Sequence, residues 1–166
     1  DAEDFDSADE LIEHVFTVNP SEPRGWSLRA AIANLSGQYE REGECRKLAL
    51  ATWQINPEVD YLIGKILSQH YRFAEAVRYQ RRSLHLDPSY LPARFQLAQD
   101  LLRSGQDDEG WSLVDQVAEA DKYNVVAFNL KTLQGQLSQF TTLQRDGLIV
   151  RMDAREARIY GERVLE

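Results

Sequence analysis

Histidine and cysteine are the residues of this chain that could do metal or nucleophilic chemistry, so their spacing decides what chemistry is open to it. None of His14, His70 and His85 lies four residues from another, the spacing that puts two metal ligands on one helix face. Cys45 is the only cysteine, which leaves no internal disulfide and no thiolate cluster. Neither a glycine-rich phosphate loop nor a Ser/His/Asp arrangement above chance is present. We therefore expect no catalytic, cofactor-binding or metal-binding residues, and a chain that is not an enzyme.

Carboxylates are concentrated at the start of the chain, in DAEDFDSADE, and such a cluster could suggest calcium. An EF-hand loop needs glycine at its sixth position and Glu at its twelfth. Counted from Asp4, those positions hold Asp9 and Val15, so the match fails. The interpretation we favour is that the carboxylates stabilise the N-terminus of a first helix.

Arginines cluster at Arg78, Arg81 and Arg82, where they could bind phosphate or an acidic peptide. A solvated face with local ion pairs is the interpretation we favour. Across the 166 residues, Lys and Arg number 19 against 27 Asp and Glu, a net charge of −8 that argues against a nucleic-acid partner. No apolar run approaches the roughly 20 residues of a membrane span. Cytoplasmic and extracytoplasmic locations both stay open.

Three apolar-periodic stretches end at Asn or Asp followed by proline, at Pro20, Pro57 and Pro88. FAEAVRYQRRSLHLDP is the third of them. The spacings are 57 − 20 = 37 and 88 − 57 = 31, which average 34, and a further step of 34 leads to EADKYN, with Lys122 in place of proline. A period of about 34 residues is typical of tetratricopeptide repeats (TPRs), each of which is a helix–turn–helix.

Small residues recur where the two helices of such a repeat approach closely. Twelve positions before each terminator stand Ala8, Cys45, Ala76 and Gly110, and the small position of the preceding helix holds Ala30, Gly64 or Ala98. Over about residues 8–138 the chain therefore resembles the TPR family. Cys45 is then expected to be a buried structural thiol rather than a nucleophile.

This resemblance implies an all-α fold, a superhelix of stacked antiparallel helix pairs, because no single pair can bury its own apolar face. We expect a leading helix at 8–18, pairs at 24–38 with 44–55, 58–70 with 73–86 and 90–104 with 107–120, and a capping helix at 124–140. Two repeats should depart from the mean length. The extra residues of the first are expected in the turn SGQYEREG (36–43), and the shortening of the second at INPEVDY (55–61).

The helical periodicity of apolar residues ends after Phe140. TTLQ and LIVRM, joined by the turn RDG, predict a β-hairpin, and Asp153 predicts the cap of a last helix. This end resembles the junction at which bacterial TPR proteins continue into a gluzincin-type, peptidase-like domain, although the His-Glu-x-x-His motif of that family is absent. The predicted organisation is a repeat domain at 1–140 and a segment at 141–166 that starts a second domain. We also expect the chain, which opens at Asp1 without Met, to be a processed protein or a piece of a longer one.

The function that the resemblance implies is non-catalytic binding of a peptide or protein segment in a concave groove lined by the first helix of each pair. Carried onto this sequence, the groove positions are Arg24, Ser27, Asn34, Tyr61, Lys65, Gln69, Phe95, Gln99, Arg103 and Asn129. Their polar and aromatic mixture, with cations at Lys65 and Arg103, suits an extended peptide held by charge pairs. The TPR subclass that clamps a C-terminal carboxylate is not matched, because its Asn and Lys/Arg positions hold Leu62, Pro92 and Gln96.

Two alternatives stay open. The chain could be an accessory module that positions substrates for a zinc-peptidase-like domain, or an open face of the stack could self-associate into a homo-oligomer.

Overall fold

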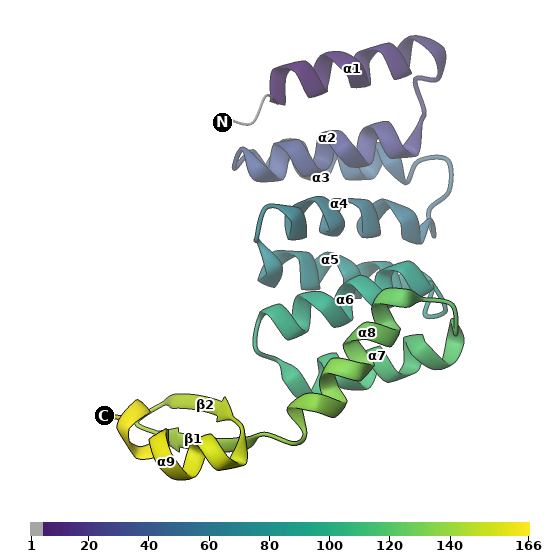
Figure 1. Ribbon diagram of the computed structural model, residues 1–166. Coiled ribbons are helices and arrows are strands. Elements are labelled where there is room, and N and C mark those ends of the chain that lie inside the picture. The colour runs from purple at the N-terminus through teal and green to yellow at the C-terminus, as the bar shows by residue number, and fades with distance from the viewer. Residues whose placement is uncertain (1–4) are drawn as a thin grey trace. The chain divides into compact units, whose positions relative to one another are not determined.

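The computed structural model describes residues 5–166, which form a succession of helices followed by one β-hairpin and a last helix (Figure 1). Residues 1–4 of the acidic opening, with the helix-stabilising role predicted for their carboxylates, lie outside this range. The elements are α1 (Phe5–Val18), α2 (Pro23–Leu35), α3 (Tyr39–Ala49), α4 (Pro57–Gln69), α5 (Phe73–Leu86), α6 (Leu91–Arg103), α7 (Asp107–Ala120), α8 (Val125–Leu137), β1 (Thr141–Arg145), β2 (Leu148–Met152) and α9 (Ala154–Val164). The predicted class, paired helices with a C-terminal hairpin and helix, is confirmed.

The described helices of the repeats begin at constant intervals, so the predicted irregular lengths are wrong. The first helices of the pairs, α2, α4, α6 and α8, begin at residues 23, 57, 91 and 125, and the second helices α1, α3, α5 and α7 begin at 5, 39, 73 and 107. The turn expected to hold extra residues is short, because α3 already begins at Tyr39. Instead α3 ends early, at Ala49, and a longer loop at 50–56 fills the repeat.

The Asn-Pro and Asp-Pro pairs do not all have one role, which explains the unequal proline spacing. α1 ends at Val18 before Asn19-Pro20, and α5 ends at Leu86 before Asp87-Pro88, as predicted. Asn56-Pro57 instead opens α4, where the Asn56 side chain accepts a hydrogen bond from the Glu58 amide. Proline favours the first turn of a helix because no intrahelical donor is lost there.

The turn inside each pair needs a residue in the left-handed region. Gly37, Tyr71 and Gly105, at equivalent positions of successive repeats, have φ values of 75°, 61° and 73°. Glycine adopts this conformation without steric cost, whereas a side chain makes it unfavourable. Tyr71 is therefore a strained exception among these three turns.

Close packing between helices builds the core of the first unit. A Cβ added at Gly64 would lie 2.5 Å from Gln80 Nε2 and 3.1 Å from the Ala76 carbonyl oxygen, so α4 and α5 touch at this point. Gly110 likewise packs against Leu102, whose nearest side-chain carbon would lie 2.8 Å from an added Cβ. One buried cluster takes side chains from all four helices α2, α3, α4 and α5. Its members are Ala30, Ala31, Cys45, Ala49, Val59, Ile63, Leu67, Ala76 and Tyr79.

One buried ion pair ties α3 to α4. The Arg46 guanidinium donates two hydrogen bonds of 2.6 Å to the Asp60 carboxylate, which is fully buried. A bidentate pair of this kind satisfies both carboxylate oxygens, and a buried charge needs such a partner.

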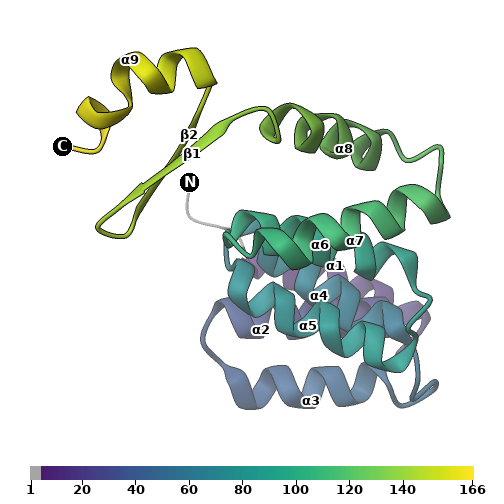
Figure 2. The ribbon, with the colours of Figure 1, turned by 90° about the horizontal axis from the view of Figure 1, so that it is seen from below.

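Internal contacts divide the chain inside α7, into one unit that ends at Leu113 and a second that covers Val114–Glu166. In the second unit β1 and β2 pair antiparallel, with Thr141 opposite Met152, and Figure 2 shows the two strands side by side. Asp146 and Gly147, both at positive φ, form the turn that an Asp-Gly hairpin favours. Gly161 of α9 lies against Leu143 of β1. The predicted domain boundary at residue 140 stays a prediction.

Candidate binding groove

Three depressions follow one another in the first unit, and each shares residues with the next. An apolar depression of about 330 Å³ lies between α1, α2 and α4. A middle depression of about 330 Å³ shares Leu35 and His70 with it. A polar depression of about 310 Å³ shares Gln69 and Tyr71 with the middle one. Because neighbouring depressions share lining residues, they adjoin one another, and we call the three together the groove.

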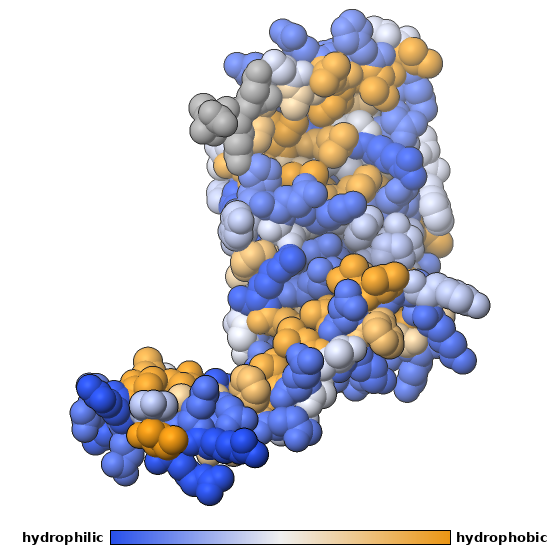
Figure 3. Space-filling model, in the orientation of Figure 1, coloured by the Kyte–Doolittle hydropathy of each residue, from blue (hydrophilic) through white to orange (hydrophobic). Residues whose placement is uncertain are grey.

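The apolar end of the groove is built by α1 lying across the first helix pair. Its lining residues are Phe5, Ala8, Leu11, Ile12, Leu28, Ile32, Leu35, Ile66 and His70. Leu11 is 68% exposed although it is a large apolar side chain. Figure 3 shows hydrophobic side chains gathered over the α1–α2 end of the first unit. Exposed apolar surface of this kind is typical of an interaction site.

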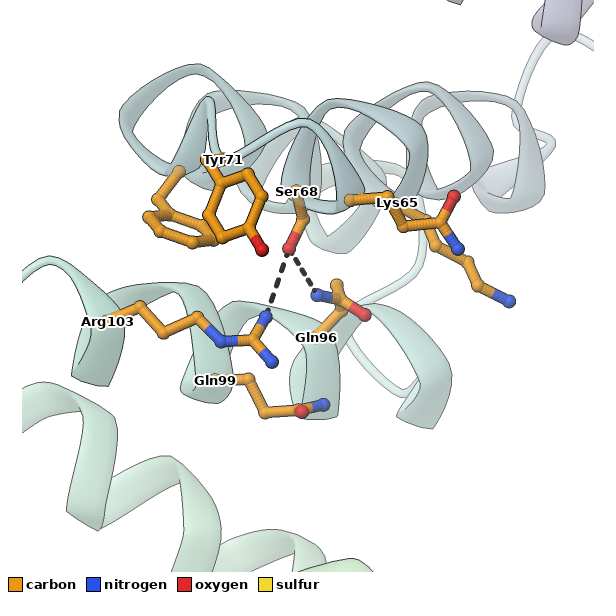
Figure 4. Close-up of a pocket in the computed structure, with 8 residues that line it drawn as sticks. Lys65, Ser68, Tyr71, Gln96, Gln99 and Arg103 are labelled. Carbon is orange, nitrogen blue, oxygen red and sulfur yellow. Dashed lines mark hydrogen bonds between the residues drawn. The ribbon is translucent and has the colours of Figure 1, made fainter. Parts of the chain in front are cut away.

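The polar end of the groove is organised around Ser68, a residue of α4 whose hydroxyl bonds to side chains of α6 (Figure 4). Its hydroxyl donates a 2.5 Å hydrogen bond to Asp100 Oδ1 and accepts one of 3.0 Å from the Gln96 amide. Arg103 Nη1 also donates to the Ser68 hydroxyl, at 3.3 Å. These bonds fix the side chains of α6 against α4, so the donors that face the groove are held in place.

Asp100 is a fully buried carboxyl beneath the polar end. Burial raises its pKa, which hydrogen bonds from Ser68 and Gln96 and the charge of Arg103, 3.7 Å away, only partly oppose. Asp100 Oδ2 has no hydrogen-bond partner among the described residues. Because one of its oxygens has no partner, the buried Asp100 carboxyl costs free energy of folding.

Two cations stand at the polar end. The Arg103 guanidinium lies 5.5 Å from the centre of the Phe73 ring, and the Lys65 ammonium lies 5.8 Å from that of Tyr61. Aromatic faces hold cations in place while leaving their N–H donors available. Arg103 is half exposed, at 48% of its side chain, so it can reach a ligand in the groove.

The structure brings together four of the predicted groove residues, Lys65, Gln69, Gln99 and Arg103, all at the polar end. In the repeat register Lys65 is equivalent to Gln99, and Gln69 to Arg103. Two equivalent positions therefore form this end in successive repeats.

The other predicted groove residues lie elsewhere. Ser27 is fully buried and donates to the Pro23 carbonyl oxygen, so its predicted contact with a ligand is wrong. Arg24 is paired with Glu58 at 2.8 Å. Tyr61 packs edge-on against Tyr90 and contacts the Lys65 ammonium, but it does not itself line the groove.

Three more predicted positions are also absent from the groove lining. Phe95 is half-buried and lines none of the three depressions. Asn34 is 3% exposed and lines a different pocket. Asn129 belongs to the second unit.

The prediction from sequence missed Ser68, Gln96, Tyr71 and Phe73, which complete the polar end. The signal that could have found the last two is the repeat spacing. Tyr71 replaces the glycine of the other turns, and Phe73 follows Phe5 and Tyr39 as the aromatic residue that begins α1, α3 and α5.

Two of the three clustered arginines of α5 take part in ion pairs, and the third, Arg82, lies 5.0 Å from the centre of the Tyr79 ring. Arg81 pairs with Glu109 at 2.8 Å and Arg78 approaches Glu75 at 3.6 Å. Cys45 is 5% exposed, as predicted for a structural thiol, and burial raises its pKa. Within residues 5–166, no three His, Cys, Asp or Glu side chains gather closely enough to hold a metal ion. Over the same residues, no helix is both long and apolar enough to cross a bilayer.

Comparison with solved structures decides the fold. The first TPR domain of Spaghetti (RPAP3) bound to an HSP90 peptide superposes with a TM-score of 0.55 at 17% identity, over 70% of this chain and 96% of that one. The fold is the TPR fold. The first TPR domain of human RPAP3 gives 0.55 at 17% identity, over 72% of this chain and 95% of that one. PilW, a type IV pilus biogenesis factor, gives 0.54 at 24% identity, over 81% of this chain and 64% of that one. Neither a protein-family model nor a curated protein sequence matches the chain.

Proposed function

We propose that this TPR chain is a non-catalytic interaction module that binds an extended segment of another protein in the groove. The observation that carries the proposal is that three adjoining depressions lead from an apolar end at α1 and α2 to a cation-bearing end at α4 and α6. A row of adjoining depressions suits a chain that is extended rather than folded, because successive side chains can enter successive depressions.

The lining predicts the chemistry of the bound segment. Leu11 and Ile32 at one end would contact apolar side chains, and Lys65 and Arg103 at the other would pair with an acidic side chain. The Gln99 amide can serve the backbone of an extended peptide as both donor and acceptor. The RPAP3 structure supports the idea, because the same fold there holds an acidic peptide, SRMEEVD.

The strained turn at Tyr71 also supports this site. Its backbone adopts the left-handed conformation, at φ 61°, where the equivalent residues are Gly37 and Gly105. Its ring is 81% exposed and lines both the middle and the polar depressions. Strain that persists at a residue facing a groove is typical of a site kept for binding.

Fluorescence polarisation with labelled peptides tests the polar end. Peptides with one apolar segment and an acidic, amidated or basic end should rank in that order of affinity. Lys65→Glu and Arg103→Glu should each weaken binding of the acidic peptide by about tenfold or more, since a charge-assisted hydrogen bond contributes about 1.5–3 kcal/mol. Lys47→Glu, at an exposed lysine of α3 outside the groove, is the control with the same charge change. If both groove reversals bind like Lys47→Glu, the polar end is not the site.

A second pair of variants tests the apolar end. Leu11→Ser should weaken the peptide with the apolar segment, whereas Val18→Ser on the same helix should not, because Val18 is 87% exposed and lies outside the groove. Both side chains are largely exposed, so neither change should disturb the fold. Equal affinity of the two variants would show that the segment does not reach α1.

The hairpin and α9 support a second candidate function, that of an accessory module beside a peptidase-like domain. Leu148, Ile149 and Ile159 are 52%, 59% and 71% exposed in this segment, which suits packing against further protein. The test is the coding sequence of the parent protein. A His-Glu-x-x-His motif downstream would support the accessory role, and a stop codon directly after Glu166 would refute it.

Light scattering across a concentration range tests the self-association alternative, which predicts a mass that rises with concentration.

A further inference from the structure

The first helix α8 belongs to a pair whose second helix is replaced by a strand. In the earlier pairs α2 packs against α3 and α4 against α5, and Gly110 of α7 packs against Leu102 of α6. Second helices begin at residues 5, 39, 73 and 107, so the repeat pattern would place the next one at residue 141. β1 begins there instead. The side of α8 that a second helix would cover therefore needs a separate account.

Three residues of α8 are exposed on this side, Val125, Thr132 and Gly135, and we call them the α8 face. Val125 is 69% exposed, and a Cβ added at Gly135 would meet nothing within 4 Å. The residues equivalent to Thr132 and Gly135 in α2, α4 and α6 are all buried: Ala30, Gly64, Ala98, Ala33, Leu67 and Leu101. A helix side that is buried in each earlier pair and exposed in the last is typical of an interaction surface.

The second helix α1 has the complementary exposure. Leu11 and Val15 are 68% and 43% exposed, and together with Ala8 they form what we call the α1 face. The residues equivalent to Leu11 and Val15 in α3 and α5 are 5% exposed or less: Cys45, Tyr79, Ala49 and Ser83. Cys45, which the proline spacing grouped with Ala8, thus takes the place of Leu11 in the observed register. α1 therefore exposes the side that α3 and α5 bury.

The pair formed by α4 and α5 shows how two such faces meet. A Cβ added at Gly64 would lie 3.0 Å from Tyr79 Cβ and 3.1 Å from the Ala76 carbonyl oxygen. Near the start of α4, the Ser83 hydroxyl donates a 2.7 Å hydrogen bond to the Pro57 carbonyl oxygen. These contacts fix the register of the antiparallel pair.

The same register assigns partners to the residues of the α8 and α1 faces. It places Thr132 against Leu11 and Ala8, and Val125 beside Val15. All of these side chains are apolar or small, and Thr132 offers a methyl group. Bringing them together removes apolar surface from water, which is the main driving force for association.

Charge favours α1 against α8 over the other pairings that two copies could form. α1 carries four carboxylates, at Asp6, Asp9, Glu10 and Glu13, and no Lys or Arg, whereas the only charged residue of α8 is Lys131. Two α1 helices would bring carboxylates together, and two α8 helices would bring two ammonium groups together. Like charges placed across an interface cost free energy. The pairing of α1 with α8 avoids both and places opposite charges on the two helices.

We propose that α8 of one copy packs against α1 of a second copy, and so completes a helix pair of the same kind as α4 with α5. The contact is heterologous, because one copy contributes its α8 face and the other its α1 face. Such contacts either close into a ring or continue into larger assemblies. Ala8 and Leu11 also line the groove, but the inference does not rest on the proposed peptide binding, since association is measured without peptide.

Sedimentation velocity on the 166-residue chain, from micromolar to millimolar concentrations, tests the proposal. The wild-type mass should rise with concentration above that of a monomer. Val15→Glu changes the α1 face and Thr132→Glu the α8 face. Each should weaken association more than tenfold, because the new carboxylate would be buried without a partner. An equimolar mixture of the two variants should form a one-to-one dimer and nothing larger, since each variant keeps one intact face.

Thr17→Glu and Tyr123→Glu are the matched controls. Both residues are exposed, as are their equivalents in the other repeats, so these changes should leave the wild-type behaviour unaltered. Val15 and Thr132 are exposed as well, so all four variants should fold, which circular dichroism checks. The proposal is overturned if the wild type stays monomeric over the whole range or if either face variant alone associates as the wild type does. It is also overturned if the mixture stays as monomeric as each face variant alone.

Discussion

Replacing Gly64 with alanine should destabilise the chain even though alanine is the better helix former. In an open helix this change stabilises by about 1 kcal/mol. Here the added Cβ would lie 2.5 Å from Gln80 Nε2, 3.0 Å from Tyr79 Cβ and 3.1 Å from the Ala76 carbonyl oxygen. Overpacking of this kind costs about 1–3 kcal/mol. Moving the Gln80 amide also weakens its 3.3 Å bond to the Tyr61 carbonyl oxygen, worth about 1 kcal/mol. The net expectation is a loss of about 1–3 kcal/mol.

Gly43→Ala is the matched control, because Gly43 also lies inside a helix of the first unit and a Cβ there would meet nothing within 4 Å. It should stabilise by roughly 1 kcal/mol, so the two Gly→Ala changes should have opposite signs. Urea unfolding followed by far-ultraviolet circular dichroism measures both. If Gly64→Ala is as stable as Gly43→Ala, then α4 and α5 do not pack as closely as described.

Three further changes test single features of the structure. Tyr71→Gly should raise the free energy of unfolding by about 1 kcal/mol, by relieving the left-handed backbone at φ 61°, while weakening peptide binding; lower stability would contradict the strain. Arg46→Met should cost about 3 kcal/mol in a urea titration, because it leaves the Asp60 carboxylate buried without its partner, and a loss below about 1 kcal/mol would show that the pair is not buried as described. Burial raises the pKa of Asp100, so its contribution to stability is full at acid pH and is lost as pH rises through the raised pKa. Asp100→Asn should remove that pH dependence from a series of urea titrations, and an unchanged profile would contradict it.

The repeat architecture could be predicted from sequence because small residues and helix terminators recur at a period that few other folds share. Ala76 and Gly110 do lie where helices touch, as their spacing indicated. The register of the first repeat could not be predicted from prolines alone. Proline both follows helix ends and opens first turns, and Pro20 and Pro57 have these two different roles.

The candidate site was predicted only where it depends on helix periodicity. Lys65, Gln69, Gln99 and Arg103 follow from the face that each first helix presents, and they line the polar end. Ser27 occupies the same face in the first repeat but is buried, because its exposure depends on what packs above it. Whether such a side chain is buried depends on tertiary packing, which the sequence period alone does not predict.

The measurement that tests the proposed function most directly is a double-mutant cycle between Arg103 and the acidic residue of a bound peptide. Affinities are measured for wild type and Arg103→Gln, each with the acidic peptide and with its Asp→Asn counterpart. A direct pair at the polar end predicts a coupling free energy of at least about 1 kcal/mol. Effects that add to within about 0.3–0.5 kcal/mol would mean that Arg103 does not touch the peptide's carboxylate, and would contradict the site.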